Sequence, residues 1–378
     1  MTTKINNEHK KVYVPNSTDR GNVIRNVPHL RFPEFEGEWE DFLINDVCSE
    51  FKSGKNIKAD SISESGEYPV YGGNGLRGYT SSYNHEGLYV LIGRQGALCG
   101  NVRSVHGKTF ITEHAIAVAG NEISNTSFLH YLFVKMNLGQ YSDQSAQPGL
   151  AVNKLLKIKV VLPSVSEQTK IARFLSLLDE RITTQNKIIE DLKKLKSAIS
   201  ESLFKEVKGD FVMLSEICEI AKGKQINGEF LSESGTYYVM NGGTEPSGYY
   251  DDYNVEANTI SISEGGNSCG YVQFNTSPFW SGGHCYTIQN IVRGVDNLYL
   301  YHYLKSREDA IMKLRIGSGL PNIQKKDLAM FKIKIPTVEQ QKAISTFLSS
   351  LERKAEIEER AQNVMQKEKL YLLQHMFI

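Results

Sequence analysis

The sequence predicts an α+β protein in which one plan, a globular domain followed by a long helix, occurs twice. A helical phrase recurs without a gap, the stretches before its two copies resemble each other, and these stretches hold short β-like runs between glycine-rich turns. We therefore expect two duplicated globular domains, each with a twisted, mainly antiparallel sheet plus helices. Two long helices that form a coiled coil would separate them.

The repeated phrase is the strongest of these signals. It reads LPSVSEQTKIARFLSLLDERI at residues 162–182 and IPTVEQQKAISTFLSSLERKA at residues 335–355. The prolines at 163 and 336 lie 173 positions apart, and this offset holds through Phe204 and Phe377. In each copy a proline followed by serine or threonine precedes the helical pattern, which is typical of a helix start.

Both copies continue as a heptad pattern, which is typical of a coiled-coil seam. The polar seam positions Gln185 and Lys196 would cost stability but fix the register. Each segment of about 40 residues would be about 60 Å long. The alternative is two amphipathic helices, each packed on its own domain; we favour pairing because both copies carry the same seam and end on the same phenylalanine. The seam residues are Leu175, Leu178, Ile182, Ile189, Leu192, Ile199 and Leu203, then Leu348, Leu351, Ala355, Met365, Leu372 and Met376.

The stretches between the helices are also duplicated, with weaker likeness. DVCSEFKSGKNI at residues 46–57 matches EICEIAKGKQI at residues 216–226, and LIGRQGALCGNV matches SISEGGNSCGYV. These matches pair the following residues: Cys48 with Cys218, Gly54 with Gly223, Cys99 with Cys269, Gly100 with Gly270, and His114 with His284.

Within the globular stretches, LYVLIG, FITEHAIAVAG, NTISIS and KIKVVLP predict strands. TSFLHYLFVKM and NLYLYHYLKSREDAIMKL predict one amphipathic helix in each domain. We expect the repeated glycines to occupy sharp turns that need a positive φ. The predicted segments are an N-terminal arm (1–38), a first globular domain (39–163), a central helix (164–208), a second globular domain (209–336) and a C-terminal helix (337–378). Residues 1–28 are expected to be a flexible tail or an arm on the C-terminal helix.

Composition places the chain in a broad class. Its 378 residues suffice for two or three domains, and 40% hydrophobic with 23% charged residues is ordinary for a soluble globular protein. No apolar run reaches membrane-spanning length, the N-terminus has no secretory pattern, and five scattered cysteines suit a reducing cytoplasm. Lysine plus arginine equals aspartate plus glutamate at 43 each, which counts mildly against a protein that holds nucleic acid alone.

Catalytic motifs are largely missing from the sequence. It has no adjacent prolines, which a DNA-base methyltransferase motif needs, and no esterase, zinc-protease or EF-hand signature. Gly107-Lys108-Thr109 resembles the end of a phosphate-binding loop, but Val102 stands where its first glycine belongs, so a turn followed by a strand is the better interpretation. The paired cysteines and histidines could hold a metal or form a nucleophile pair. Without close local pairs among them we favour packing, and predict no metal and no catalytic residue.

The polar loop positions, by contrast, differ between the two domains. Arg94-Gln95 stands opposite Glu264-Gly265, and arginine and glutamine make bidentate contacts to guanine and adenine edges. The first domain has 11 basic and 10 acidic residues over 41–163, and the second has 11 basic and 14 acidic residues over 210–336. Because neither domain is strongly basic, other subunits would have to supply much of the affinity for DNA. The predicted DNA-binding residues are Lys52, Lys55, Asn74, Arg77, Arg94, Gln95, Lys108, Gln147, Lys222, Lys224, Gln225, Asn241, Thr244, Glu264, Asn267, Ser318 and Asn322.

The chain resembles the specificity (S) subunit of type I restriction–modification systems, which serve host defence. LRFPEFEGEWED at residues 30–41 resembles the entry to the first target-recognition domain, and the two helical phrases resemble the conserved spacers. The resemblance implies a non-catalytic chain whose two target-recognition domains each read one half of a split double-stranded DNA site. Its long helices would run antiparallel, set the gap and dock two modification (methyltransferase) subunits, through seam residues such as Leu175 and Leu348.

Restriction (translocase and nuclease) subunits would join further out. S-adenosylmethionine for DNA methylation, and ATP with Mg²⁺ for restriction, would bind to the partner subunits and not to this chain. The second phrase reads SLERKA where the first reads LLDERI, so the two helices need not bind partners equally. A repeat-built protein–protein scaffold is the alternative function.

Overall fold

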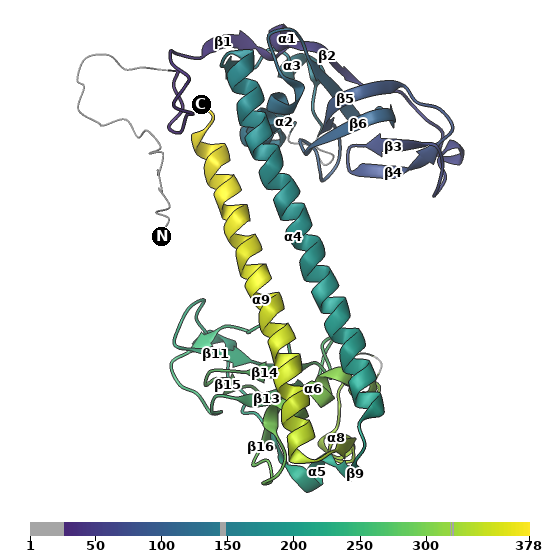
Figure 1. Cartoon of the computed structure of the whole chain (residues 1–378), viewed down its shortest axis with the longest axis vertical. Coiled ribbons are helices and arrows are strands. Elements are labelled where there is room, and N and C mark those ends of the chain that lie inside the picture. The colour runs from purple at the N-terminus through teal and green to yellow at the C-terminus, as the bar shows by residue number, and fades with distance from the viewer. Residues whose placement is uncertain (1–25, 144–148, 318, 320) are drawn as a thin grey trace, which may run out of the picture. The chain divides into compact units, whose positions relative to one another are not determined.

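The computed structural model describes residues 26–143, 149–317, 319 and 321–378. Its contacts divide the chain into two units (Figure 1). Unit 1 comprises positions up to Thr184 together with Ala361–Ile378, and unit 2 comprises Gln185–Arg360. The predicted arm therefore falls mostly outside the described residues; from Asn26 onward it is described, and the Leu30 N–H donates to the His375 carbonyl at 2.8 Å.

Unit 1 contains a six-stranded sheet in the order β2-β7-β5-β6-β3-β4. Neighbouring strands are antiparallel except β3 and β6, which pair in parallel. A separate antiparallel pair joins β1, the first strand of the domain, to β8, its last strand. The strands are β1 (Glu40–Leu43), β2 (Cys48–Ser53), β3 (Tyr68–Gly72), β4 (Gly75–Thr80), β5 (His85–Gly93), β6 (Val102–Ile111), β7 (Ala115–Gly120) and β8 (Lys159–Leu162).

The central strand β5 is apolar throughout its second half because both of its faces are covered. Successive side chains point to opposite faces, so Val90 and Ile92 enter the main core while Leu91 enters a smaller cluster on the other face. The helix α2 (Thr126–Met136) packs on the main core and is capped by the Asn125 side chain, which accepts from the Phe128 N–H at 3.1 Å. The short helices are α1 (Ile44–Val47) and α3 (Val152–Leu155), with 3₁₀ turns η1 (Ala59–Ser61) and η2 (Leu138–Tyr141).

Unit 2 repeats this plan. Its sheets have the orders β10-β16-β13-β14 and β12-β11-β15, with the pair β9–β17. The strands are β9 (Asp210–Met213), β10 (Glu219–Lys222), β11 (Tyr237–Met240), β12 (Tyr249–Tyr250), β13 (Thr259–Ser263), β14 (Val272–Asn275), β15 (Trp280–Ser281), β16 (Cys285–Gln289) and β17 (Lys332–Ile335). The helices are α5 (Leu214–Ile217), α6 (Asn297–Ser306), α7 (Glu308–Met312) and α8 (Lys325–Ala329), with a 3₁₀ turn η3 (Gly228–Phe230). The predicted α+β fold with duplicated, mainly antiparallel domains is confirmed.

Three local expectations were wrong. The run FITEHAIAVAG is broken after Ile111 by a turn that precedes β7, and the predicted helix of unit 2 is broken at Arg307 into α6 and α7. The Glu308 carboxylate accepts from the Val272 N–H at 2.8 Å, which ties the start of α7 to β14. Gly107-Lys108-Thr109 lies inside β6 and not in a turn before it.

The repeated glycines serve two different purposes. Gly100 and Gly270 have positive φ angles of 87° and 92°, as expected. Gly54 and Gly223 do not; instead, a Cβ atom on either would lie 2.2 Å from a backbone carbonyl oxygen, that of Ile111 or Gly282. These two glycines are needed for close approach of two backbones, which the sequence did not distinguish from a turn.

The two long helices pair with each other within each unit. They are α4 (Val165–Glu206) and α9 (Val338–His375). In unit 2 the Gln185 side chain donates to Glu358 Oε2 at 2.5 Å, and Lys196 Nζ lies 2.7 Å from Glu352 Oε1. The contacts pair higher residue numbers in α4 with lower residue numbers in α9, so the two helices run antiparallel in unit 2. In unit 1, Lys369 of α9 lies 2.5 Å from Asp179 of α4.

The predicted seam matches the burial along both helices. Every predicted seam residue is buried or half-buried, whereas Phe174, Leu177, Ile188 and Leu195 between them are exposed. Both polar seam positions of α4 are paired with carboxylates of α9, so the pairing prediction is confirmed. The helices also pack on the domains: Leu175 belongs to the core of unit 1 and Phe204 to that of unit 2. No helix in the described part of the chain is long and apolar enough to cross a membrane.

Candidate nucleic-acid interface

In each unit, many of the predicted polar residues lie where several strands end together. In unit 1, β2 ends at Ser53, two residues before Lys55, and β5 ends at Gly93, directly before Arg94. In unit 2, β10 ends at Lys222, two residues before Lys224, and β13 ends at Ser263, directly before Glu264. The site is therefore formed from segments far apart in the sequence, and it is formed twice.

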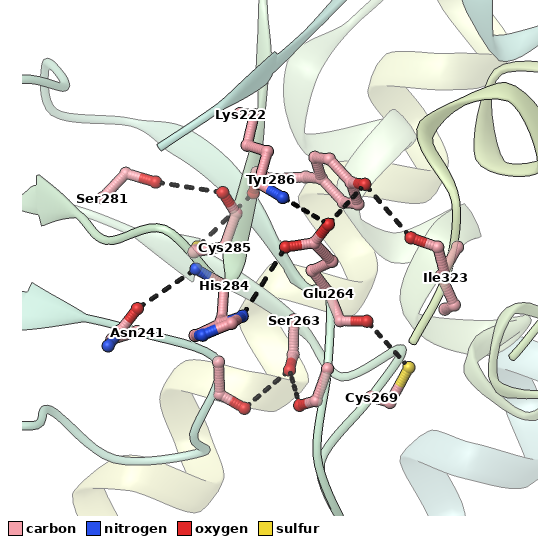
Figure 2. Close-up of polar contacts among 12 residues, drawn as sticks. Lys222, Asn241, Ser263, Glu264, Cys269, Ser281, His284, Cys285, Tyr286 and Ile323 are labelled. Atoms are coloured by element: carbon pink, nitrogen blue, oxygen red, sulfur yellow. Dashed lines mark hydrogen bonds and ion pairs between the residues drawn. The ribbon is translucent and has the colours of Figure 1, made fainter. Parts of the chain in front are cut away.

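Glu264 lies at the centre of the site in unit 2 (Figure 2). Only 7% of this residue is exposed. Its Oε1 accepts from Lys222 Nζ at 2.6 Å and from the Tyr286 hydroxyl at 3.0 Å, while Oε2 lies 3.8 Å from Nδ1 of His284. Burial, together with the hydrogen bond and the negative charge of Glu264, raises the pKa of the Tyr286 hydroxyl. The tyrosine thus remains a donor, and its hydroxyl also bonds to the Ile323 carbonyl at 3.1 Å.

The backbone around Glu264 is fixed from two sides. The Glu264 N–H donates to the His284 carbonyl at 2.9 Å, and the His284 N–H donates to Asn241 Oδ1 at 3.1 Å. Lys224 bonds through its N–H to the Ser281 carbonyl at 2.8 Å. Lys222 therefore contacts Glu264 directly, whereas Lys224 and Asn241 bind the segment that leads to and carries His284.

Unit 1 has the same arrangement with different side chains. The Arg94 N–H donates to the His114 carbonyl at 2.9 Å, the counterpart of the Glu264–His284 bond. Arg94 Nη1 lies 3.1 Å from the Ser53 hydroxyl, where unit 2 has the Glu264–Lys222 ion pair. The register supports this equivalence, since Ser53 opposes Ile116 on β7 and Lys222 opposes Tyr286 on β16. Ile116 and Tyr286 are 170 positions apart and Ser53 and Lys222 are 169 apart, and the difference of one matches the one-residue irregularity in β2.

A pocket of about 260 Å³ opens at this point of unit 1. Gln95 Oε1 lies 3.2 Å from Nδ1 of His114 at its edge. Its lining residues are Gly72, Gly73, Asn74, Arg77, Gln95 and His114. Three of the predicted DNA-binding residues of unit 1, namely Asn74, Arg77 and Gln95, therefore share one pocket.

The predicted residues differ in exposure. Arg94 and Asn241 are half-buried and Glu264 is buried, and the other described ones are exposed. Lys108 lies 4.9 Å from the ring centre of Tyr83, apart from the pocket residues, and Lys52 forms a 3.1 Å ion pair with Glu50. Gln147 and Ser318 lie outside the described residues. The exposed, described members are Lys52, Lys55, Asn74, Arg77, Gln95, Lys108, Lys222, Lys224, Gln225, Thr244, Asn267 and Asn322.

The repeated cysteines are held as thiols. Burial raises the pKa of Cys48 and of Cys218 to about 12. The thiols of Cys99 and Cys269 donate to the carbonyls of Arg94 and Glu264, at 3.2 and 3.0 Å. A thiol in such a setting is a poor nucleophile and a poor metal ligand. Among the described residues no group of three or more potential metal ligands comes together.

From the sequence, the paired histidines were candidates only as metal ligands or catalysts. The structure places them at the candidate interface, in the same backbone position of both units. Their common distance of 15 residues from a paired cysteine was the available signal. It indicated a shared framework but could not tell what surrounds the imidazole rings.

Comparison with known proteins identifies the family. Residues 36–194 and 206–367 each match the type I restriction modification DNA specificity domain. The chain belongs to this family. DNA specificity subunits of type I systems are accordingly its relatives: it is 40% identical over 177 residues to the EcoprrI specificity subunit of Escherichia coli, a match that covers 46% of this chain and 43% of that one. It is 24% identical over 344 residues to a putative type I restriction enzyme specificity subunit of Haemophilus influenzae, covering 84% of this chain and 88% of the relative.

Solved structures of the family share the fold. A type I S subunit from M. genitalium superposes with a TM-score of 0.73 at 19% identity, covering 93% of this chain and 99% of that one. A chain from a structure described as the basis of complex assembly and conformational transition of the type I system gives a TM-score of 0.54 at 17% identity, covering 91% and 97%. The shared fold agrees with the family assignment of this chain.

Proposed function

We propose that each unit reads one half of a bipartite DNA site. The observation that supports this most is the repeated site itself. Arg94 with Ser53 in unit 1, and Glu264 with Lys222 in unit 2, occupy the same backbone positions with different chemistry. A constant framework with interchangeable polar groups is what two related domains need to recognise two different sequences. The predicted DNA-binding residues are the proposed contacts, apart from the revision given below for Glu264.

We also propose that the long helices dock two modification subunits, with restriction subunits joining the complex. Apolar side chains on α4 and α9 outside the paired seam support this. In unit 1, Phe174 of α4 is 41% exposed and Tyr371 of α9 is 54% exposed. In unit 2, Ile188 and Leu195 of α4 are 40% and 50% exposed, and Ile357 of α9 is 49% exposed. Exposed apolar rows at heptad spacing suit partner helices.

On this proposal the chain itself carries no reaction. Methyl transfer with S-adenosylmethionine, and restriction with ATP and Mg²⁺, would belong to the partner subunits in the cytoplasm. The proposed division of labour within the chain is an arm at 1–38, target-recognition domains at 39–163 and 209–336, and spacer helices at 164–208 and 337–378. The helices would hold the two half-sites at a fixed separation.

Methylome sequencing of the host, with and without the gene for this chain, tests the proposal. We expect one bipartite methylated motif to disappear on deletion and to return on complementation. Exchanging residues 41–163 for the corresponding domain of a relative should change one half of the motif and leave the other unchanged. An unchanged methylome, with the chain still bound to protein partners, would favour the protein–protein scaffold instead.

A further inference from the structure

The paired histidines have no role in the proposed set of DNA contacts, although they lie in the middle of both sites. His284 has 63% of its side chain exposed, and His114 has 47%. A buried histidine is most often a packing residue, but neither of these is buried. Each lies on the turn before β16 or β7, with its carbonyl bound by the backbone of the residue that follows β13 or β5.

Glu264 is poorly placed to contact a base itself. Its side chain is 9% exposed, and Oε2 has no hydrogen-bond partner among the described residues. An unpaired buried carboxylate oxygen is costly, and a nearby positive charge is its usual compensation. The groups that face this carboxylate are Lys222 from β10, Tyr286 from β16 and His284 from the turn before it.

The charge of Glu264 acts on the exposed groups around it. A carboxylate attracts and orients the hydrogen-bond donors that lie next to it. Lys222 and His284, whose side chains are 52% and 63% exposed, both lie against the buried Glu264 carboxylate (Figure 2). Donors held in this way suit the acceptors of DNA, which are phosphate oxygens and the N7 and O6 atoms of guanine.

We propose that His284 and His114 contact DNA in the two half-sites, and that Glu264 is a positioning residue that holds His284 and Lys222 toward DNA. In unit 1 the histidine is held differently. Its Nδ1 lies 3.2 Å from Gln95 Oε1, and its Nε2 lies 3.4 Å from Glu113 Oε1. Unit 2 thus presents a lysine and a histidine backed by one buried carboxylate, whereas unit 1 presents the histidine between a neutral amide and the Glu113 carboxylate.

This inference rests on the proposed function, and its test uses the complex of the full chain with its modification subunits. Binding to a duplex with the methylated motif of this system is measured by fluorescence anisotropy at several salt concentrations. We expect His284→Gln to weaken binding about tenfold. His114→Gln should have a similar effect. The matched control is His106→Gln, because His106 is exposed on β6 and lies outside both sites; its affinity should equal that of the unchanged complex.

Glu264→Gln gives the sharper test, because two roles predict opposite signs. Removing a negative charge near the interface would by itself strengthen binding to any DNA. A positioning role predicts weaker binding to the specific site, with little change on unrelated DNA. Tighter specific binding of Glu264→Gln would overturn that role, and so would a changed base preference with unchanged affinity, which would make Glu264 a direct contact.

His284→Gln and His114→Gln change exposed side chains, so we expect both variants to fold even if Glu264→Gln does not. They therefore test the proposal independently of Glu264→Gln. For a histidine variant, an equal loss of affinity on every DNA duplex with a single changed base pair indicates a phosphate contact. A loss that depends on one particular base pair indicates a base contact. Both results support the proposal. If the unchanged complex is specific and both histidine variants bind as it does, the proposal is wrong while the proposed function stands. If the unchanged complex has no specific site, the proposed function itself is wrong.

Discussion

At the scale of single residues, the repeated phrase contains a buried glutamine that joins helix to domain. Gln168 is fully buried, accepts from the Asn125 N–H at 2.8 Å, and donates to the carbonyls of Ile123 and Pro163 at 3.0 and 2.8 Å. Its counterpart Gln341 makes the equivalent three bonds in unit 2. The glutamine in SEQ and EQQ therefore connects the start of each long helix to the segment before α2 or α6.

Replacing this glutamine should be costly. Gln168→Leu leaves three buried backbone groups without partners, so we expect a loss of about 3 kcal/mol or more in the free energy of unfolding of unit 1. Urea unfolding of the purified chain, followed by circular dichroism, measures it. Gln340→Leu is the control, because Gln340 is exposed and adjacent to the buried Gln341. Equal stability of Gln168→Leu and the unchanged chain would contradict the assigned role.

His302 predicts a dependence of stability on pH. Burial lowers the pKa of this histidine to about 4, and its Nε2 lies 2.9 Å from the Ser349 hydroxyl. In the unfolded chain this histidine takes up a proton near pH 6.5, whereas in the folded chain it does so only near pH 4. The stability that comes from keeping His302 neutral is therefore complete above pH 6.5 and is lost as the pH falls toward 4. At pH 5 the loss is about 2 kcal/mol.

The variant for this test is His302→Leu, which removes the imidazole from this buried position. Urea unfolding at pH 7.5 and pH 5 should show a smaller difference in stability for the variant than for the unchanged chain. The remaining difference includes His130, whose pKa is also lowered to about 4 by burial. Equal acid sensitivity of the two chains would refute the assignment to His302.

At the scale of elements, both units lock the helix pair to the domain in the same way. In unit 1, Asp179 of α4 accepts from the Tyr131 hydroxyl at 2.9 Å and from Lys369 of α9. In unit 2 the roles of the helices are exchanged. Glu352 of α9 accepts from the Tyr301 hydroxyl at 3.1 Å and from Lys196 of α4 at 2.7 Å.

Charge reversal tests this lock. Lys196→Glu places two carboxylates together in a partly buried seam, and we expect a loss of about 1–2 kcal/mol in the stability of unit 2. The double variant Lys196→Glu with Glu352→Lys should recover more than half of it. The same reversals at Lys193 and Glu359, whose side chains are 62% and 40% exposed, should change stability by less than about 1 kcal/mol. Denaturant titration of the unchanged chain, the four single variants and the two double variants gives both coupling energies, and equal values would argue against the lock.

The elements also differ in how far the sequence predicted them. The long helices and α2 were predicted well, since their apolar spacing repeats over many residues. The break at Arg307 and the turn after Ile111 were missed because a single side-chain contact or a short turn decides them, and neither interrupts the apolar pattern.

At the scale of the whole molecule, the proposed function makes the long helices a spacer between two half-sites. Inserting four residues after Ile189, matched by four after Ala355 so that the seam stays paired, adds about 6 Å of helix. We expect methylome sequencing to find both half-sites unchanged and the gap between them longer. Altered half-sites with an unchanged gap would show that the helices do not set the spacing.

The sequence alone determined the duplication, the seam of the long helices and the family likeness, because each depends on spacing along the chain. It also indicated which loops differ between the repeats. Only the tertiary structure decided that Lys222, Glu264 and His284 meet, and that the glutamate lies buried beside the exposed lysine and histidine. These residues come from separate strands and turns, and the distance between side chains on different strands depends on sheet order and register, which linear spacing does not specify.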